Sequence, residues 1–177
     1  MIFLKKLFIV FLLMAAALSI TSCGSAGETQ TPEESEEQVQ IGNPLRESDK
    51  KEIQKLTGAS FNMPSKFDNI SYYVIENSGL HSIGQAGFEY NDAYYTFRVM
   101  KSTLLDDISG MYYNWTETKE CEIEGLSGEM RSFESESECA CTILLFDSEN
   151  EILYSLSSSD RQAFQDIEKC FEIILKQ

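Results

Sequence analysis

The feature of this sequence that most constrains its fold is a series of short segments of strand-like composition joined by turn residues. Residues 70–76 are rich in Tyr, Val and Ile, and residues 81–90 and 93–101 flank Asn91-Asp92, which is typical of a tight hairpin. Two further pairs follow: 116–123 and 127–134 around Gly125, and 139–146 and 151–157 around Asp147-Ser148-Glu149-Asn150. Because strands linked by short turns pair antiparallel, the chain predicts a mainly antiparallel β-sheet of about six or seven strands.

Two helices are expected to flank these strands. Residues 50–57 follow Asp49 and Glu52, which form a capping-box-like pair, and stop before Gly58. At the C-terminus, Ser159 and Gln162 form a second predicted capping box. An apolar stripe then repeats at helical spacing: Ala163, Phe164, Ile167, Cys170, Phe171, Ile174 and Leu175. The predicted class is therefore α+β, with a short N-terminal helix and a C-terminal amphipathic helix packed on one face of the sheet.

The N-terminus carries a short apolar run behind two positive charges. Lys5 and Lys6 precede the run from Leu7 to Ile20, which is shorter than the roughly 20 residues of a spanning helix and typical of an export signal. The run ends in Ile20-Thr21-Ser22-Cys23, which resembles the lipobox of bacterial lipoproteins. The resemblance implies that Cys23 receives a diacylglycerol, that cleavage follows Ser22, and that fatty chains such as palmitate anchor Cys23 to the cell membrane on its outer face.

An ordinary secretory signal, cut near Ala17 or Ser22, is the alternative. We favour the lipoprotein interpretation and expect three regions: a signal peptide over 1–22, a lipidated Cys23 with a disordered acidic tether over 23–42, and one globular domain over 43–177. The tether holds Glu28, Glu33, Glu34, Glu36 and Glu37 and no basic residue. Such a segment is too polar to bury a core.

The net charge limits the partners. The chain carries −15, and removal of Lys5 and Lys6 with the signal takes the mature chain to −17. That charge repels phosphate backbones and anionic headgroups, so no nucleic-acid partner is expected. The expected partners are the membrane, through the lipid on Cys23, and an unknown protein, peptide or glycan at the cell surface.

Histidine and cysteine bound the chemistry. His81 is the single histidine, which disfavours His-based triads and zinc sites, and no metal or cofactor is expected. Four cysteines remain once Cys23 is lipidated: Cys121, Cys139, Cys141 and Cys170. They could form two disulfides, or stay as buried thiols. A zinc site is a weaker alternative, because the usual two-residue gap between paired cysteines is missing. We favour buried thiols slightly.

From Asn43 onward the chain resembles a domain family of unknown function found in clostridial lipoproteins and membrane-anchored regulators. The residues that carry the likeness are Asn43-Pro44, Phe97-Arg98, Asp106-Asp107-Ile108-Ser109-Gly110 with Tyr112-Tyr113-Asn114, and Tyr154-Ser155-Leu156-Ser157. The resemblance implies fold and location, and brings no activity with it.

Five residues near this motif are the candidate ligand- or partner-binding residues. Asp107 is expected to cap a single helical turn that Gly110 ends, or with Asp106 to bind a cation or basic partner. Arg98 is expected to pair with one of these carboxylates, or to receive an anionic ligand. Tyr113 and Trp115 could bind sugars or peptides, or simply pack in the core.

Other motifs are weaker. Asp147-x-Glu149-x-Glu151 begins like a calcium loop but lacks its glycine, so a hairpin turn is the better prediction. The most probable function by this reasoning is a non-enzymatic binding or sensing lipoprotein. An accessory or regulatory domain contacting a membrane protein is the second possibility. A carboxylate-based hydrolase of wall glycans ranks last, because no catalytic pair can be chosen from sequence.

Overall fold

The computed structural model describes residues 45–76 and 81–177. The predicted signal peptide, Cys23, the acidic tether and Asn43-Pro44 lie outside the described residues.

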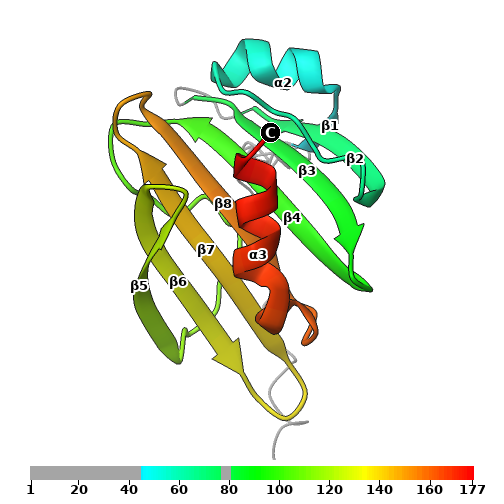
Figure 1. The fold of residues 1–177 in the computed structure, drawn as a ribbon, viewed down its shortest axis with the longest axis vertical. Coiled ribbons are helices and arrows are strands. Elements are labelled where there is room, and N and C mark those ends of the chain that lie inside the picture. The colour runs from blue at the N-terminus through cyan, green and yellow to red at the C-terminus, as the bar shows by residue number, and fades with distance from the viewer. Residues whose placement is uncertain (1–44, 77–80) are drawn as a thin grey trace, which may run out of the picture. The chain divides into compact units, whose positions relative to one another are not determined.

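The described residues form an eight-stranded sheet with two helices (Figure 1). The strands are β1 (Leu45–Glu47), β2 (Asp68–Ile75), β3 (Ile83–Tyr90), β4 (Ala93–Lys101), β5 (Glu117–Ile123), β6 (Leu126–Glu134), β7 (Cys139–Asp147) and β8 (Ile152–Ser158). Their order across the sheet is β1-β2-β3-β4-β8-β7-β6-β5, and every neighbouring pair is antiparallel. The predicted antiparallel sheet is confirmed, and the predicted number of strands is corrected to eight. The additional strand is β1, whose three residues are too few to show an alternating pattern.

The hairpin turns form where the sequence predicted them. Asn91 and Asp92 both have positive φ, 50° and 61°, as the tight turn between β3 and β4 requires. Glu124 and Gly125, with φ of 53° and 80°, make the equivalent turn between β5 and β6. Between β7 and β8, Asp147 Oδ1 accepts hydrogen bonds from the backbone N–H groups of Glu149 and Asn150 at 3.1 and 3.0 Å. The calcium-like motif is therefore a hairpin turn closed by its own aspartate.

Helix α2 (Lys50–Thr57) matches its predicted bounds. Asp49 caps it by accepting hydrogen bonds from the N–H groups of Lys51 and Glu52, and Gly58 ends it in the left-handed conformation with φ of 71°. The Glu52 side chain takes no part in the cap. It accepts a bond from the Ser48 hydroxyl at 2.7 Å instead.

Helix α3 (Ala163–Leu175) buries the predicted stripe, but its start differs from the prediction. Gln162 occupies the N-cap position and makes no side-chain capping bond, so the expected Ser159–Gln162 capping box does not form. The first turn instead begins with a bond from the Ala163 N–H to the Asp160 carbonyl at 3.0 Å. The buried residues of α3 are Ala163, Ile167, Cys170, Phe171 and Ile174.

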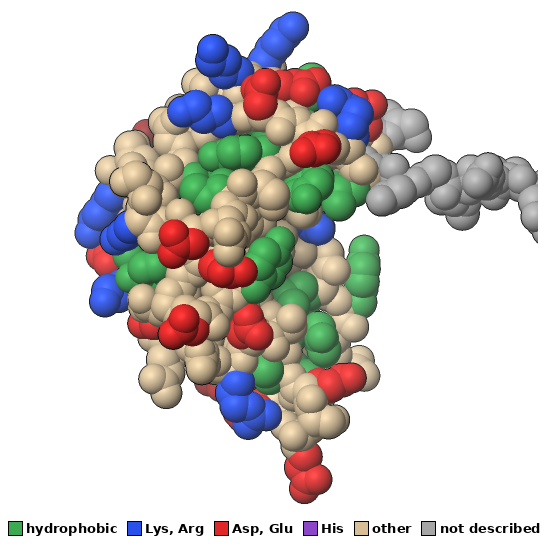
Figure 2. All heavy atoms as spheres, turned by 90° about the vertical axis from the view of Figure 1, so that its right-hand side faces the viewer, with side chains coloured by type: hydrophobic (Ala, Val, Ile, Leu, Met, Phe, Trp, Pro, Cys, Tyr) green, Lys and Arg blue, Asp and Glu red, His purple; other side chains and the backbone are tan. Residues whose placement is uncertain are grey.

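Both helices cover the same face of the sheet, which we call the helix face. Phe97 of β4 stands at its centre, with its ring centroid 5.4 Å from Phe61 and 5.9 Å from Phe171. Ile53 of α2 belongs to the same hydrophobic cluster. Figure 1 shows α3 lying across β8 and β7. Figure 2 shows the domain from the β1–β2 side, with acidic side chains grouped near the centre of the view.

Candidate functional site

The Asp106–Gly110 motif lies in the connection between β4 and β5, residues 102–116, which we call the crossover segment. β4 is central and β5 is an edge strand, so this segment must pass β8, β7 and β6 to connect them. It passes on the side opposite the helices, which we call the crossover face. Ile108 and Ser109 are buried against this face, 5% and 3% exposed. The crossover segment thus covers part of the crossover face of the sheet.

Arg98 holds the middle of the crossover segment. In β4 it alternates with the core residues Phe97 and Val99, so its side chain is on the crossover face. Its Nη1 donates to the Ile108 carbonyl at 2.9 Å, and its Nε donates to Gln85 Oε1 at 2.8 Å. Burial lowers the pKa of Arg98, while the nearby Tyr112 and Asp107 oppose this shift. The structure therefore places Arg98 on a backbone carbonyl, where we had expected a direct pair with Asp106 or Asp107.

The partner of Asp107 is Arg131 of β6. Arg131 Nη1 lies 2.7 Å from Asp107 Oδ2, and Arg131 also pairs with Glu129. The other oxygen of Asp107, Oδ1, accepts bonds from the Ser109 N–H at 2.9 Å and from its hydroxyl at 2.6 Å. The segment forms no helical turn here, so Asp107 caps a bend of two residues and not the single turn we had predicted.

The backbone conformation at residue 110 and the closeness of Arg98 both require a glycine there. Its φ is +69°, a conformation that residues with a Cβ rarely adopt. A Cβ placed there would lie 2.1 Å from Arg98 Nη1. The glycine therefore lets the chain lie directly on the guanidinium.

Asp106 points away from this network. It is exposed, and its Oδ1 accepts the Asp107 N–H at 2.8 Å. The two adjacent carboxylates therefore have separate surroundings, and they do not form a paired site.

The aromatic residues that follow the motif divide into two kinds. Tyr113 is half-buried and packs against Trp115 and Phe133 with tilted rings, whose centroids lie 5.7 and 5.2 Å from its own. Tyr112 is 97% exposed. The candidate residues Arg98, Asp107, Tyr113 and Trp115 thus belong to one face of the sheet and one crossing segment. Their contacts there are mainly with one another and with the sheet.

Two buried hydroxyls also belong to the crossover face. Thr142 pairs across the ladder with Arg131, and Ser155 pairs with Arg98. Both residues are fully buried, and their hydroxyl oxygens have no hydrogen-bond partner among the described residues. The sheet beneath the crossover segment is therefore more polar than the helix face.

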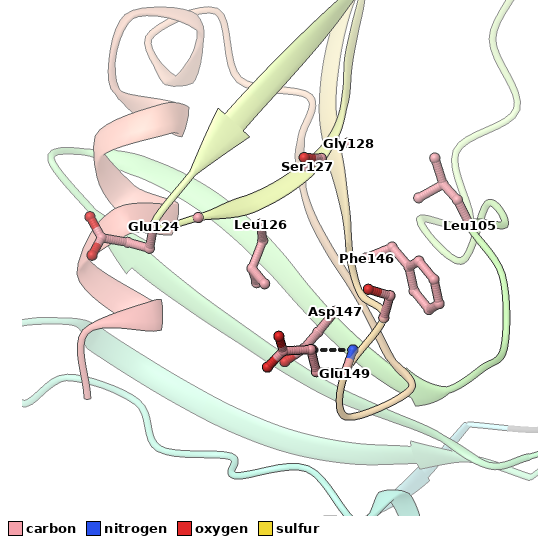
Figure 3. Close-up of a pocket in the computed structure, with 10 residues that line it drawn as sticks. Leu105, Glu124, Leu126, Ser127, Gly128, Phe146, Asp147 and Glu149 are labelled. Carbon is pink, nitrogen blue, oxygen red and sulfur yellow. Dashed lines mark hydrogen bonds between the residues drawn. The ribbon is translucent and has the colours of Figure 1, made fainter.

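Two cavities lie beside the β5–β6 hairpin. One, of about 650 Å³, opens on the crossover face between Leu105 and the strand residues Glu120, Glu122 and Glu129. The other, of about 570 Å³, continues to the end of the sheet. Figure 3 shows it between the β5–β6 and β7–β8 turns, with Phe146 directed toward Leu105. Both cavities are lined by Leu105, Ser127 and Gly128, so they join as one groove.

The lining of this groove is acidic and apolar. Its carboxylates are Glu120, Glu122, Glu124, Glu129, Asp147 and Glu149. Partial burial opposes ionisation of Asp147, but hydrogen bonds from Asn150 and from the Glu149 N–H outweigh it and hold the pKa of Asp147 below its usual value. The described residues contain no group of three or more His, Cys, Asp or Glu side chains suited to a metal ion. Sequence reasoning missed this groove, although alternating glutamates in 117–129 mark one of its walls.

All four cysteines of the domain are free thiols. Cys139, Cys141 and Cys170 are buried and Cys121 is half-buried. Burial raises the pKa of Cys141 and of Cys170 to about 12, with a smaller contribution from nearby Cys139 and Asp166 respectively. These thiols therefore pack as small apolar groups, as the favoured prediction held.

No helix of the described residues has both the length and the apolar character needed to cross a membrane. Comparisons with family models, with curated proteins and with solved structures find no match to this chain.

Proposed function

We propose that this chain is a lipid-anchored extracytoplasmic protein that binds a protein partner and performs no catalysis. The lipobox-like sequence ending at Cys23 supports the anchor, and the acidic tether after it supports a domain held away from the membrane. The proposed binding surface is the outer side of the crossover segment.

One observation carries the binding proposal. Five large hydrophobic side chains are exposed among the described residues, and three of them, Leu104, Leu105 and Tyr112, belong to the crossover segment. Their exposed fractions are 59%, 39% and 97%. Because Arg98 and Arg131 fix the segment between them, these apolar groups are presented on a supported backbone. Exposed apolar groups gathered on such a segment are typical of a protein-binding surface.

The exposed apolar side chains favour the role of an accessory or regulatory domain. An accessory or regulatory domain needs an apolar contact surface for a membrane protein, and the tether places the domain near such partners. The Arg98 and Asp107 side chains bind their own neighbours, which favours contact through the crossover segment over capture of an anion by Arg98.

A glycan hydrolase is less well supported. Its general acid would need a carboxyl with a raised pKa, held close to a second carboxylate across a cleft. Asp147 lines the acidic groove, but its pKa is shifted in the opposite direction.

The binding proposal is tested with surface variants in cells. Leu104→Ser with Tyr112→Ser should abolish co-isolation of any partner cross-linked to the wild-type chain. Leu56→Ser changes an exposed leucine of α2, 41% exposed, and serves as the matched control. Equal cross-linking of both variants would contradict the crossover segment as the binding surface. Mass spectrometry of the mature N-terminus tests the anchor separately, since an unmodified Cys23 would contradict it.

A further inference from the structure

The outer edge of β5 is a long strand edge without a neighbour among the described residues. β5 is the last strand of the sheet order and pairs only with β6, over seven residues without a bulge. The opposite edge is formed by β1, which has only three residues. Proteins usually shorten, bulge or charge an exposed edge to prevent strand addition. The charges of β5 on the crossover face are Glu120 and Glu122, which repel an acidic strand but attract a basic one. The one lysine of β5, Lys119, is on the helix face and pairs with Glu168 at 3.2 Å.

The backbone groups available on this edge follow from the hairpin. Ile123 and Leu126 close the two-residue turn and face each other across it. In such a hairpin the closing pair is hydrogen-bonded, so Ile123, Cys121, Lys119 and Glu117 bond to β6. The N–H and C=O groups of Thr118, Glu120 and Glu122 therefore point outward. Their side chains are on the crossover face, beside the groove.

The charge of the groove selects the occupant. Glu129 is paired with Arg131, and Glu124 lies 3.2 Å from Lys176. Glu120, Glu122 and Glu149 have no ion pair with another described residue. None of the residues that line the groove is a lysine or arginine. The groove and the edge together therefore suit a ligand that carries positive charge along an extended backbone.

Two other occupants are disfavoured by the same charges. The tether of this chain contains five glutamates and no basic residue, so it is repelled by the groove. A second copy of β5, added antiparallel about its centre, would place Glu120 opposite Glu120. Like charges directly opposite on neighbouring strands are destabilising.

We propose that β5 and its groove bind a basic, extended peptide segment of a partner protein by strand addition. This inference deepens the proposed function and rests on it, because it names the class of partner. In the complex, basic side chains spaced two residues apart face Glu120 and Glu122. The aliphatic stems of these basic side chains contact Leu105, which lines the groove beside Glu120 and Glu122. The segment receives backbone hydrogen bonds from the outward groups of residues 118, 120 and 122.

The test uses the lipidated chain in non-ionic detergent and two synthetic peptides. The first is a blocked seven-residue peptide in which lysine alternates with valine, and the second has glutamate in place of lysine. Fluorescence anisotropy should show that the lysine peptide binds and that its binding weakens as the salt concentration is raised. The glutamate peptide should not bind. Amide signals of residues 118, 120 and 122 should shift and become protected from hydrogen exchange on binding.

Two variants separate the charge from the edge. Glu120→Gln with Glu122→Gln keeps the shape of the groove and should weaken binding about tenfold. Glu136→Gln with Glu138→Gln makes the same change of charge in the exposed β6–β7 turn and should leave binding unchanged. Glu120→Pro removes an outward N–H without removing a bond to β6, and should abolish binding beyond the effect of Glu120→Gln. Glu136→Pro is its control.

Unchanged binding by the Glu120 variants, equal binding of both peptides, or amide shifts confined to the crossover segment would overturn strand addition at β5. Any of these outcomes would leave the proposed function standing, provided that Cys23 is lipidated and that Leu104→Ser with Tyr112→Ser still loses the cross-linked partner. Loss of those two results with peptide binding intact would instead contradict the proposed function.

Discussion

Asp107 and Asp106 are adjacent residues with opposite structural importance. Asp107 binds Arg131 and accepts bonds from the N–H and the hydroxyl of Ser109, whereas the side chain of Asp106 accepts one local bond and is exposed. Asp107→Asn should lower the free energy of unfolding by about 1–2 kcal/mol, because it removes a partly buried charged pair. Asp106→Asn, the matched control, should change it by less than about 0.5 kcal/mol. Urea unfolding of both variants measures the difference, and equal effects would contradict the assigned roles.

The buried thiols predict a loss of stability at high pH. Folding raises the pKa of Cys141 and Cys170 from 9.0 to about 12, so the unfolded chain releases these protons first. Their contribution to stability is therefore complete below pH 9 and declines as the pH rises toward 12. The urea midpoint should fall between pH 8 and pH 11, and Cys141→Ala with Cys170→Ala should reduce that fall. A slope that the double variant leaves unchanged would show that other groups cause it.

For individual residues, the sequence indicated where the Asp106–Gly110 motif lies but not which residues it contacts. Asp107 was recognisable as a capping residue because aspartate commonly bonds to the backbone two residues further on. Its second partner, Arg131, lies 24 residues away in another hairpin. The order of strands in the sheet decides whether two such distant residues meet. The local sequence pattern carries no information about that order.

Among the elements, α3 is the helix whose apolar stripe most clearly stabilises the domain. Phe171 is fully buried on its inner side and contacts Phe97 edge to face. Phe171→Ala should lower the free energy of unfolding by about 3–5 kcal/mol through lost burial and a residual cavity. Lys169→Ala, an exposed change on the same helix, should cost under about 0.5 kcal/mol. Thermal unfolding followed by circular dichroism compares them, and similar midpoints would refute the assigned packing.

The elements were the most predictable level of this structure. Alternation and turn residues are local properties, so seven strands and both helices could be placed before the structure was known. β1 was missed because its place depends on the free edge of β2 and not on its own composition. The acidic groove was missed because Leu105, the β5–β6 turn and the β7–β8 turn come together only through the order of strands.

For the whole molecule, the proposed lipid anchor on Cys23 makes a prediction about where the acidic domain is found. Cys23→Ala should transfer the protein from the membrane fraction to the medium, because the thiol proposed to receive the lipid is absent. Cys121→Ala leaves Cys23 in place and serves as the control, since Cys121 lies within the domain on β5. Immunoblots of both fractions measure the change. An unchanged distribution of the Cys23 variant would indicate attachment by another means.

The sheet order also has a consequence for how the chain reaches its native state. β1 to β4 and β5 to β8 are two consecutive meanders, and the β4–β8 ladder is the one strand pairing that joins them within the described sheet. Thr96 and Ser157, which meet in that ladder, are 61 residues apart. Closing so long a loop has a large entropic cost, so each half can assemble early while the seam forms late. Docking of the two halves at this seam, with α3 packed across it, is thus expected to be the last step of folding.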